Sequence, residues 1–385
     1  MKSGKALPWA LIAAASLGSF AATSSGTTRA PFLIDMARDF DVSMPLVANL
    51  VSLTATSWGV TSALGGWLSD RIGRRMLLVA APLGLAVTMV LQAVAGDFLA
   101  LALWAGLSGG FCGTFMGVAF AEVSSQVEDG QRGRALGWVM SGQSLTLLVG
   151  VPMAAAAGQF IGWRGWLICV GVLALLSSLA LFLTVKPSRR PAAGTRRPRW
   201  TTGFSPRIWG LMGASVAERI CYGLAIVYFA TFLQMTYDLS LAALAIPLAL
   251  FAIGNVAGTI LGGQLADRLR DRLATFAFFM AASGAAALVL FWWRPSIEVS
   301  VVLGFIYVLL NALARPSLMA SIAAVPDSVR GTVMGLQGTA ASVGWVGAAA
   351  LGAAMLGAGG FAWFGPLATA LALAGALGAL WCRRR

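Results

Sequence analysis

One short charged segment occurs twice in this chain, and its repetition constrains the architecture more than any other feature. Residues 65–71 read Gly-Gly-Trp-Leu-Ser-Asp-Arg, and residues 262–268 read Gly-Gly-Gln-Leu-Ala-Asp-Arg, at an offset of 197 residues. The pair Arg132-Gly133 recurs as Arg330-Gly331 at an offset of 198. Two matches at nearly one offset indicate a duplicated unit whose copies run in the same direction. We therefore expect two similar halves around a shared central site.

The stretches between these charged segments are long and apolar. Hydrophobic residues make up 58% of the 385 residues and charged residues only 11%, whereas soluble proteins carry roughly 25% charged residues. At about 20 residues for each crossing, roughly twelve helices fit. The predicted fold class is an all-α membrane protein with twelve transmembrane helices in two pseudo-symmetric six-helix bundles. The predicted spans are 8–36, 46–69, 74–95, 98–122, 131–159, 164–185, 207–235, 240–266, 272–293, 297–324, 329–356 and 361–382.

The composition also divides the chain and orients it. Residues 1–187 are predicted as the N-terminal bundle, 188–206 as a cytoplasmic linker rich in Pro, Arg, Thr and Gly, and 207–385 as the C-terminal bundle. On this topology the basic residues collect on one side. The exceptions are Arg38, Arg164 and Arg294 in external segments and Arg29, Arg219 and Arg315 within spans. This bias predicts a multi-pass protein of a bacterial-type inner membrane with both termini in the cytoplasm.

Several classes of function are disfavoured by the same composition. The net charge of +13 is explained by orientation in the membrane, so we expect contact with lipid and no nucleic-acid partner. The chain has no His, and Cys112, Cys169, Cys221 and Cys382 are interpreted as small packing residues because they show no metal-ligand spacing. We expect no enzyme activity, no metal and no cofactor, a proton gradient as driving force, a small-molecule substrate and a monomer.

The repeated segment resembles the signature loop between the second and third helices of the major facilitator superfamily. The residues that carry this resemblance are Gly66, Asp70, Arg71, Gly73, Arg74 and Arg75, with Gly263, Asp267 and Arg268 in the second copy. The resemblance covers nearly the whole chain and implies transport by alternating access.

The resemblance also implies gating contacts at this loop. Asp70 would face residues 329–332, and Arg71 or Arg74 would pair with Glu122 at the end of the fourth span. Asp267 and Arg268 would make the mirrored contacts near residues 131–133. The alternative interpretation is static tethering of the loops.

The fifth span carries a second pattern, formed by Gly142, Gly150, Pro152 and Gly158. It resembles the motif of the drug–proton antiporter branch, where that motif marks exporters. The match is partial, because Val151 precedes Pro152 where glycine is usual, and Ala105 stands where the fourth helix of that branch usually has an arginine. The alternative is a packing kink of the kind that proline produces.

Glu218 is the acidic residue that lies deepest within a predicted span. Ser215, Glu218 and Tyr222 follow helical spacing and share one face, and Arg219 or Arg315 can pair with the carboxylate. A charge at this depth is expected to face the bundle interior. The pattern favours proton coupling or recognition of a substrate cation, and the alternative is a structural ion pair.

The remaining candidates are polar residues within spans. Arg29 would either snorkel to the outer headgroups or line the outer cavity, and Asn255 and Asn311 are further candidates for substrate or proton binding. Residues interpreted as liners or as ordinary packing are Gln143, Tyr228, Tyr307, Gln337 and Trp345. Three arginines against one acid within the spans favour an anionic or zwitterionic substrate.

We therefore predict a secondary active transporter, an antiporter for proton-driven efflux of a small organic molecule. The alternative is proton symport that takes up a small anionic metabolite. A receptor or scaffold on the same fold is disfavoured because both copies of the gate segment are intact. Neither the substrate nor the coupling stoichiometry can be read from the residues.

Overall fold

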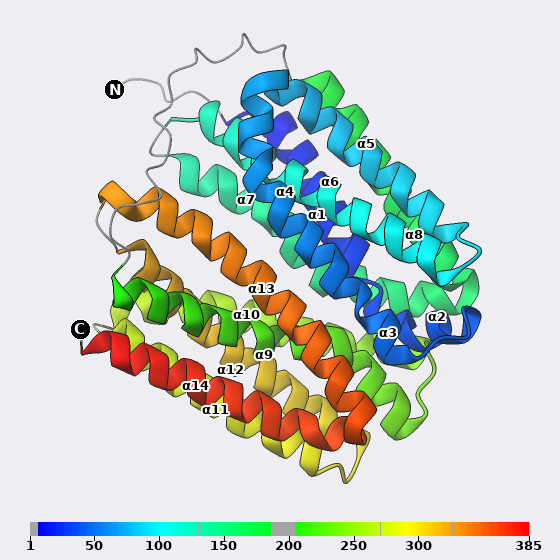
Figure 1. Ribbon diagram of the computed structural model, residues 1–385, viewed down its shortest axis with the longest axis vertical. Coiled ribbons are helices and arrows are strands. Elements are labelled where there is room, and N and C mark those ends of the chain that lie inside the picture. The colour runs from blue at the N-terminus through cyan, green and yellow to red at the C-terminus, as the bar shows by residue number, and fades with distance from the viewer. Residues whose placement is uncertain (1–6, 129–130, 186–204, 270, 325–326, 385) are drawn as a thin grey trace. The chain divides into compact units, whose positions relative to one another are not determined.

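The computed structural model describes residues 7–128, 131–185, 205–269, 271–324 and 327–384. Every regular element among these residues is a helix (Figure 1). The contacts divide the chain into two compact units, one formed by residues 1–40 and 53–195 and the other by residues 41–52 and 196–385. We call them the N-terminal and C-terminal units. Most of the linker predicted at 188–206 lies outside the described residues.

The N-terminal unit contains the first six crossings. Its elements are α1 (Trp9–Thr27), η1 (Ala30–Phe32), α2 (Leu33–Asp39), α4 (Leu50–Ile72, mostly in this unit), α5 (Arg74–Ala93), α6 (Phe98–Ser125), α7 (Arg132–Leu145), η3 (Thr146–Gly150) and α8 (Val151–Thr184). Gly73 separates α4 from α5 with a φ of 93°, a conformation that glycine adopts without steric cost. The side chain of Asp97 caps α6 by accepting from the Ala100 amide over 2.8 Å.

Two of these crossings are interrupted. The first changes to the 3₁₀ turn η1 after Thr28, where proline occupies position 31. The fifth contains the π-helical segment η3, which ends two residues before Pro152. Proline supplies no amide hydrogen and clashes with the carbonyl four residues earlier, so a widened turn at this position has a direct local cause.

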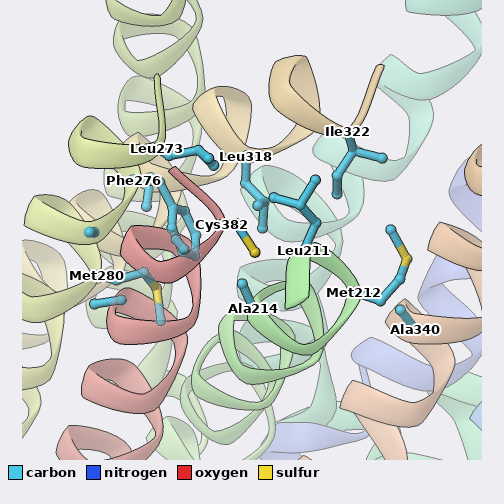
Figure 2. Packing of buried hydrophobic residues seen from close by; sticks show 14 of the residues in the cluster. Leu211, Met212, Ala214, Leu273, Phe276, Met280, Leu318, Ile322, Ala340 and Cys382 are labelled. Carbon is cyan, nitrogen blue, oxygen red and sulfur yellow. The ribbon is translucent and has the colours of Figure 1, made fainter. Parts of the chain in front are cut away.

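The C-terminal unit contains the other six crossings. Its elements are α3 (Met44–Ala48), α9 (Pro206–Tyr237), η4 (Ala242–Leu244), α10 (Ala245–Arg268), α11 (Arg272–Trp292), α12 (Ile297–Ala323), α13 (Asp327–Gly359), η5 (Gly360–Trp363) and α14 (Phe364–Arg383). Figure 2 shows an apolar cluster in which side chains from α9, α11, α12, α13 and α14 meet, among them Leu211, Phe276 and Leu318. The cluster joins helices that are distant in sequence.

The helix lengths match a membrane. Eight helices among the described residues are long and apolar enough to cross one, judged by length and composition alone. Two of them, of 51 and 48 residues, are long enough for two crossings each, and each contains a glycine with positive φ, Gly162 and Gly360. Together with α1 and α4 they supply the twelve crossings. Large apolar side chains such as Phe160, which is 82% exposed, suit contact with lipid.

Tight glycine contacts hold one helix pair in each unit. On α6, a Cβ added at Gly109 or Gly113 would overlap the backbone carbonyl of Thr54 or Trp58 on α4. On α10, a Cβ at Gly258 or Gly262 would overlap the carbonyls of residues 309 and 313 on α12. Small residues let helix backbones approach closely inside a membrane. The second and fourth crossings of each unit therefore pack backbone to backbone.

The cysteines only partly agree with the packing interpretation. Cys112, Cys221 and Cys382 are buried, but Cys169 is exposed on α8. The prediction that all four are packing residues is therefore wrong for Cys169, whose position faces outward from the helices of its unit.

Candidate functional site

The strongest concentration of buried charge lies on α9 of the C-terminal unit. Glu218 is twelve residues from the start of α9 at Pro206, or about 18 Å along the helix at 1.5 Å per residue. A bilayer core is about 30 Å thick, so this depth is near its middle. The Glu218 side chain is 0% exposed. A carboxylate at this depth requires a cationic or hydrogen-bonding partner.

Two arginines meet this carboxylate, one from a neighbouring helix and one from the next residue. The Nε atom of Arg315 on α12 donates to Oε1 of Glu218 over 2.9 Å. The Nε atom of Arg219 lies 3.8 Å from Oε2, which is too long for a hydrogen bond. Oε2 has no hydrogen-bond partner among the described residues. Both candidate partners predicted for Glu218 are therefore present, and Arg315 makes the closer contact.

The ring of Tyr222 lies close to both guanidinium groups. The Cζ atom of Arg315 lies 4.2 Å from the centroid of the Tyr222 ring, and that of Arg219 lies 5.5 Å from it. Trp345 on α13 meets Tyr222 edge to face, with 5.8 Å between ring centroids. Guanidinium groups above aromatic faces are stabilised by the ring quadrupole. We use the name α9 cluster for the set formed by Glu218, Arg219, Tyr222, Arg315 and Trp345.

Close helix packing positions these rings. A Cβ at Gly344, next to Trp345, would overlap the side chain of Arg219. A Cβ at Gly223 would lie 2.5 Å from the Cβ of Ala348. Because glycine stands at both positions, α13 approaches α9 closely enough for Trp345 to contact Tyr222.

Other polar residues of this unit serve mainly as ties between helices. On α9, Ser215 accepts from Nε2 of Gln337 over 2.8 Å. The hydroxyls of Tyr307 and Tyr228 donate to the carbonyls of Cys221 and Ala349 over 2.6 and 2.7 Å. These contacts support the packing interpretation of the two tyrosines.

The two asparagines proposed as binding residues are also buried. Asn311 is 1% exposed, and its Nδ2 lies 3.8 Å from the Met280 sulfur. Asn255 is 6% exposed. The side-chain oxygen of each has no partner among the described residues. Both remain candidates, and neither is hydrogen-bonded to the α9 cluster among the described residues.

The N-terminal unit contains a buried arginine with neutral partners. Arg29 is 2% exposed; its Nη2 donates to Oε1 of Gln92 over 2.6 Å and its Nη1 to Oγ1 of Thr54 over 3.3 Å. Thr54 in turn donates to the Ala105 carbonyl over 3.3 Å. Arg29 therefore does not snorkel. Its guanidinium is linked through Thr54 to the backbone of the fourth crossing, at the position where the resembled branch usually has an arginine.

One predicted gate contact is present within the N-terminal unit. Nη1 of Arg74, at the start of α5, lies 3.8 Å from Oε2 of Glu122 near the end of α6. Gln126 donates to the other carboxylate oxygen over 2.7 Å. The adjacent Arg75 donates to the Phe182 carbonyl over 3.1 Å. These bonds fix the segment that follows Gly73.

The other gate residues are less well defined. The side chains of Gly66, Asp70 and Arg71 lie outside the described part of the chain, as do those of residues 329–332. In the second copy, Asp267 and Arg268 are exposed at the end of α10. A Cβ at Gly263 would meet nothing within 4 Å. The gating role of both copies stays a prediction.

The glycines of the fifth crossing face the first. A Cβ at Gly142 would overlap the Ser16 carbonyl, and one at Gly158 would overlap the Phe32 ring. At Gly150 a Cβ would lie 3.4 Å from the Phe20 ring. These positions account for close helix packing, and Pro152 follows the π-helical segment.

Comparison with known proteins agrees with this architecture. A family model described as Major Facilitator Superfamily matches residues 15–348. The chain is 26% identical over 255 residues to the inner membrane transport protein YdhP of Escherichia coli K12, covering 66% of each chain. It is also 26% identical over 265 residues to a chloramphenicol resistance protein of Streptomyces lividans, covering 68% of each. The chain thus spans about two thirds of the length of these relatives.

A solved structure has a similar fold. The crystal structure of a bacterial homologue of the human lysosomal transporter Spinster matches with a TM-score of 0.76. The match covers 99% of this chain and 98% of the other, at 18% identity, so it bears on the fold alone. Together with the twelve crossings, these matches confirm the predicted fold class.

Proposed function

This chain belongs to the major facilitator superfamily, and from that premise we propose that it is a secondary active transporter that exports a small organic molecule in exchange for protons. Alternating access would move the substrate across a bacterial inner membrane in which both termini are cytoplasmic. The proposal is supported by the relatives named above, one of which is a resistance protein, and by the glycine and proline pattern of the fifth crossing.

Proton coupling is proposed because of the burial and the hydrogen bonding of the Glu218 carboxylate. Its carboxylate is fully buried, with one oxygen held by Arg315 and the other without a hydrogen bond in the described structure. An ionised Glu218 ties α9 to α12 through charge. Protonation removes that charge and weakens the tie, so proton binding changes the interaction between two crossings of one unit.

A second function is favoured by the charge of the same cluster. Two guanidinium groups surround one carboxylate, so the site is better suited to an anion than to a cation. Symport of a proton with a small anionic metabolite is therefore the competing proposal. In that case protonation of Glu218 and binding of the anion would assist each other, because each changes the local charge in the direction that the other requires.

One experiment separates the two proposals. Purified protein in proteoliposomes is tested with an imposed pH gradient of either polarity against a panel of labelled compounds. Export by exchange requires substrate to move against the proton flow, and symport requires both to move together. The absence of gradient-dependent movement for every compound would contradict both proposals.

A second experiment is made in cells. Deletion of the gene should raise sensitivity to a toxic compound if the protein exports, and should prevent growth on a nutrient if it imports.

A further inference from the structure

The charge of the α9 cluster is not balanced within its own unit. The cluster holds two guanidinium groups and one carboxylate. The other acidic residues of this unit lie in connections or within two residues of a helix end, and they are Asp41, Asp238, Asp267, Asp271, Glu298 and Asp327. With Glu218 ionised, one positive charge therefore remains in the interior of the described unit. An unpaired charge at membrane depth is unfavourable and marks a functional site.

The surplus charge is accompanied by unused hydrogen-bond donors. Nε of Arg219 and Nη2 of Arg315 are buried and have no hydrogen-bond partner among the described residues. Both side chains are nevertheless 16% exposed, whereas that of Glu218 is 0% exposed. The two arginines are thus partly accessible from outside the cluster, and the carboxylate lies behind them. This arrangement provides donors for an acceptor that the described residues do not supply.

The surroundings of these donors are aromatic. The Tyr222 ring lies beneath the Arg315 guanidinium, and the partly buried Trp345 packs against the edge of that ring. Flat apolar groups pack favourably on such rings. Tyr222 itself is only 5% exposed, so the partly buried Trp345 supplies the accessible aromatic surface beside an anionic group at the arginines.

We propose that the α9 cluster is the substrate subsite for a carboxylate attached to an aromatic or similarly flat apolar body. A carboxylate carries one negative charge and balances the surplus of one, whereas a phosphate monoester carries nearly two. Guanidinium groups also match the planar carboxylate geometrically. This inference rests on the proposed transport function, and it fits the symport form, in which protonation of Glu218 and binding of the anion assist each other.

Ligand-dependent stability of the protein in lipid nanodiscs tests the charge class. The probes are benzoate, phenylacetate and indole-3-acetate, each compared with its amide, and benzylamine as a cation. A ligand that binds only the folded state stabilises it by RT ln(1 + L/Kd), where L is the free ligand concentration, and so raises the midpoint of thermal unfolding as its concentration exceeds Kd. We expect at least one carboxylate to stabilise the protein while its amide does not. The proposal is overturned if no carboxylate stabilises, or if the amides or benzylamine do so equally.

Substitutions test the location of the subsite. Arg315→Gln and Arg219→Gln should each weaken binding of the stabilising carboxylate roughly tenfold. Glu218→Gln should instead tighten it several-fold, because the resident anion that competes for Arg315 is removed. Arg38→Gln, at an exposed position in the N-terminal unit, should leave binding unchanged.

The opposite sign of the Glu218 effect excludes a merely structural role. If Glu218→Gln weakens the carboxylate as much as the arginine variants do, the assignment is wrong. Failure of this inference is distinguishable from failure of the transport proposal. Gradient-driven movement of neutral or cationic compounds alone rejects the carboxylate subsite, whereas carboxylate binding without any movement rejects transport.

Discussion

Arg315 on α12 donates from Nε to Oε1 of Glu218 on α9 over 2.9 Å, although Arg219 directly follows Glu218 in sequence and stays at 3.8 Å. The closer partner is therefore the one from another helix. Because the bond joins two crossings, a change in the charge of Glu218 acts on helix packing as well as on the local field. That link between one proton and two helices underlies the first prediction.

Glu218→Gln should abolish transport driven by a pH gradient while the protein remains folded. The amide keeps the shape of the side chain and can still accept a hydrogen bond, but it cannot exchange a proton. Transport is measured in proteoliposomes over a range of pH, with the thermal unfolding midpoint as the test of folding. A pH dependence equal to that of the wild type would remove Glu218 from the coupling role.

Arg74 and Glu122 should act as one unit during the transport cycle. Their side chains are 26% and 7% exposed, and the charged atoms lie 3.8 Å apart. Arg74→Gln and Glu122→Gln should each slow turnover, and the double variant should be no slower than either. The expected coupling is about 0.5–3 kcal/mol, as for contacting residues in general. Additive effects in the double-mutant cycle would show that the pair is not a functional unit.

Adjacent glycines in the second copy of the repeated segment should respond differently to substitution. A Cβ at Gly262 would lie 2.6 Å from the Leu313 carbonyl, whereas one at Gly263 would meet nothing within 4 Å. Gly262→Ala should destabilise the protein by about 1–3 kcal/mol through overpacking. Gly263→Ala should be neutral or slightly stabilising, because alanine favours helix. Equal unfolding midpoints for the two variants would contradict the close approach of α10 to α12.

Arg29→Gln should impair transport more than stability. Arg29 is held by the neutral groups of Thr54 and Gln92, and replacement of a buried charge by a neutral group is often tolerated. We expect at least a tenfold loss of transport with little change in the unfolding midpoint, and partial recovery in Arg29→Lys. A parallel loss of stability and transport in both variants would assign Arg29 a structural role instead.

The lengths of the apolar stretches predicted the crossings well, because the tendency of a helix to cross a membrane depends on its local composition. The span predicted at 98–122 is the helix Phe98–Ser125, and that predicted at 272–293 is Arg272–Trp292. The interruption of the first crossing was not predicted, and for the fifth crossing a proline kink was only the alternative interpretation. The 3₁₀ turn at Ala30–Phe32 and the π-helical segment at Thr146–Gly150 lie inside the spans predicted as continuous at 8–36 and 131–159. Only Pro31 and Pro152 gave a local signal.

The interaction partners of the site residues were harder to predict than the site residues themselves. Helical spacing correctly placed Ser215, Glu218 and Tyr222 on one buried face, but it gave no means to choose Arg315 over Arg219. The contacts of Arg29 with Thr54 and Gln92 were missed, because residues 25 and 63 positions apart meet only through tertiary packing. Trp345 packs against Tyr222 in the α9 cluster, and the residues around Trp345 in the sequence did not indicate this contact.

In both units glycines let the second and fourth crossings pack closely, but the glycines lie on different helices of the pair. In the N-terminal unit the glycines lie on the fourth crossing, α6, and in the C-terminal unit they lie on the second, α10. The duplicated halves have therefore diverged into complementary surfaces. Exchange of only one of these helices between the halves would place two glycine faces together or two faces without glycine together. In either chimera the close fit of a glycine face against a partner backbone would be lost. The helix pair is therefore the smallest segment that could be exchanged between the halves without loss of this close packing.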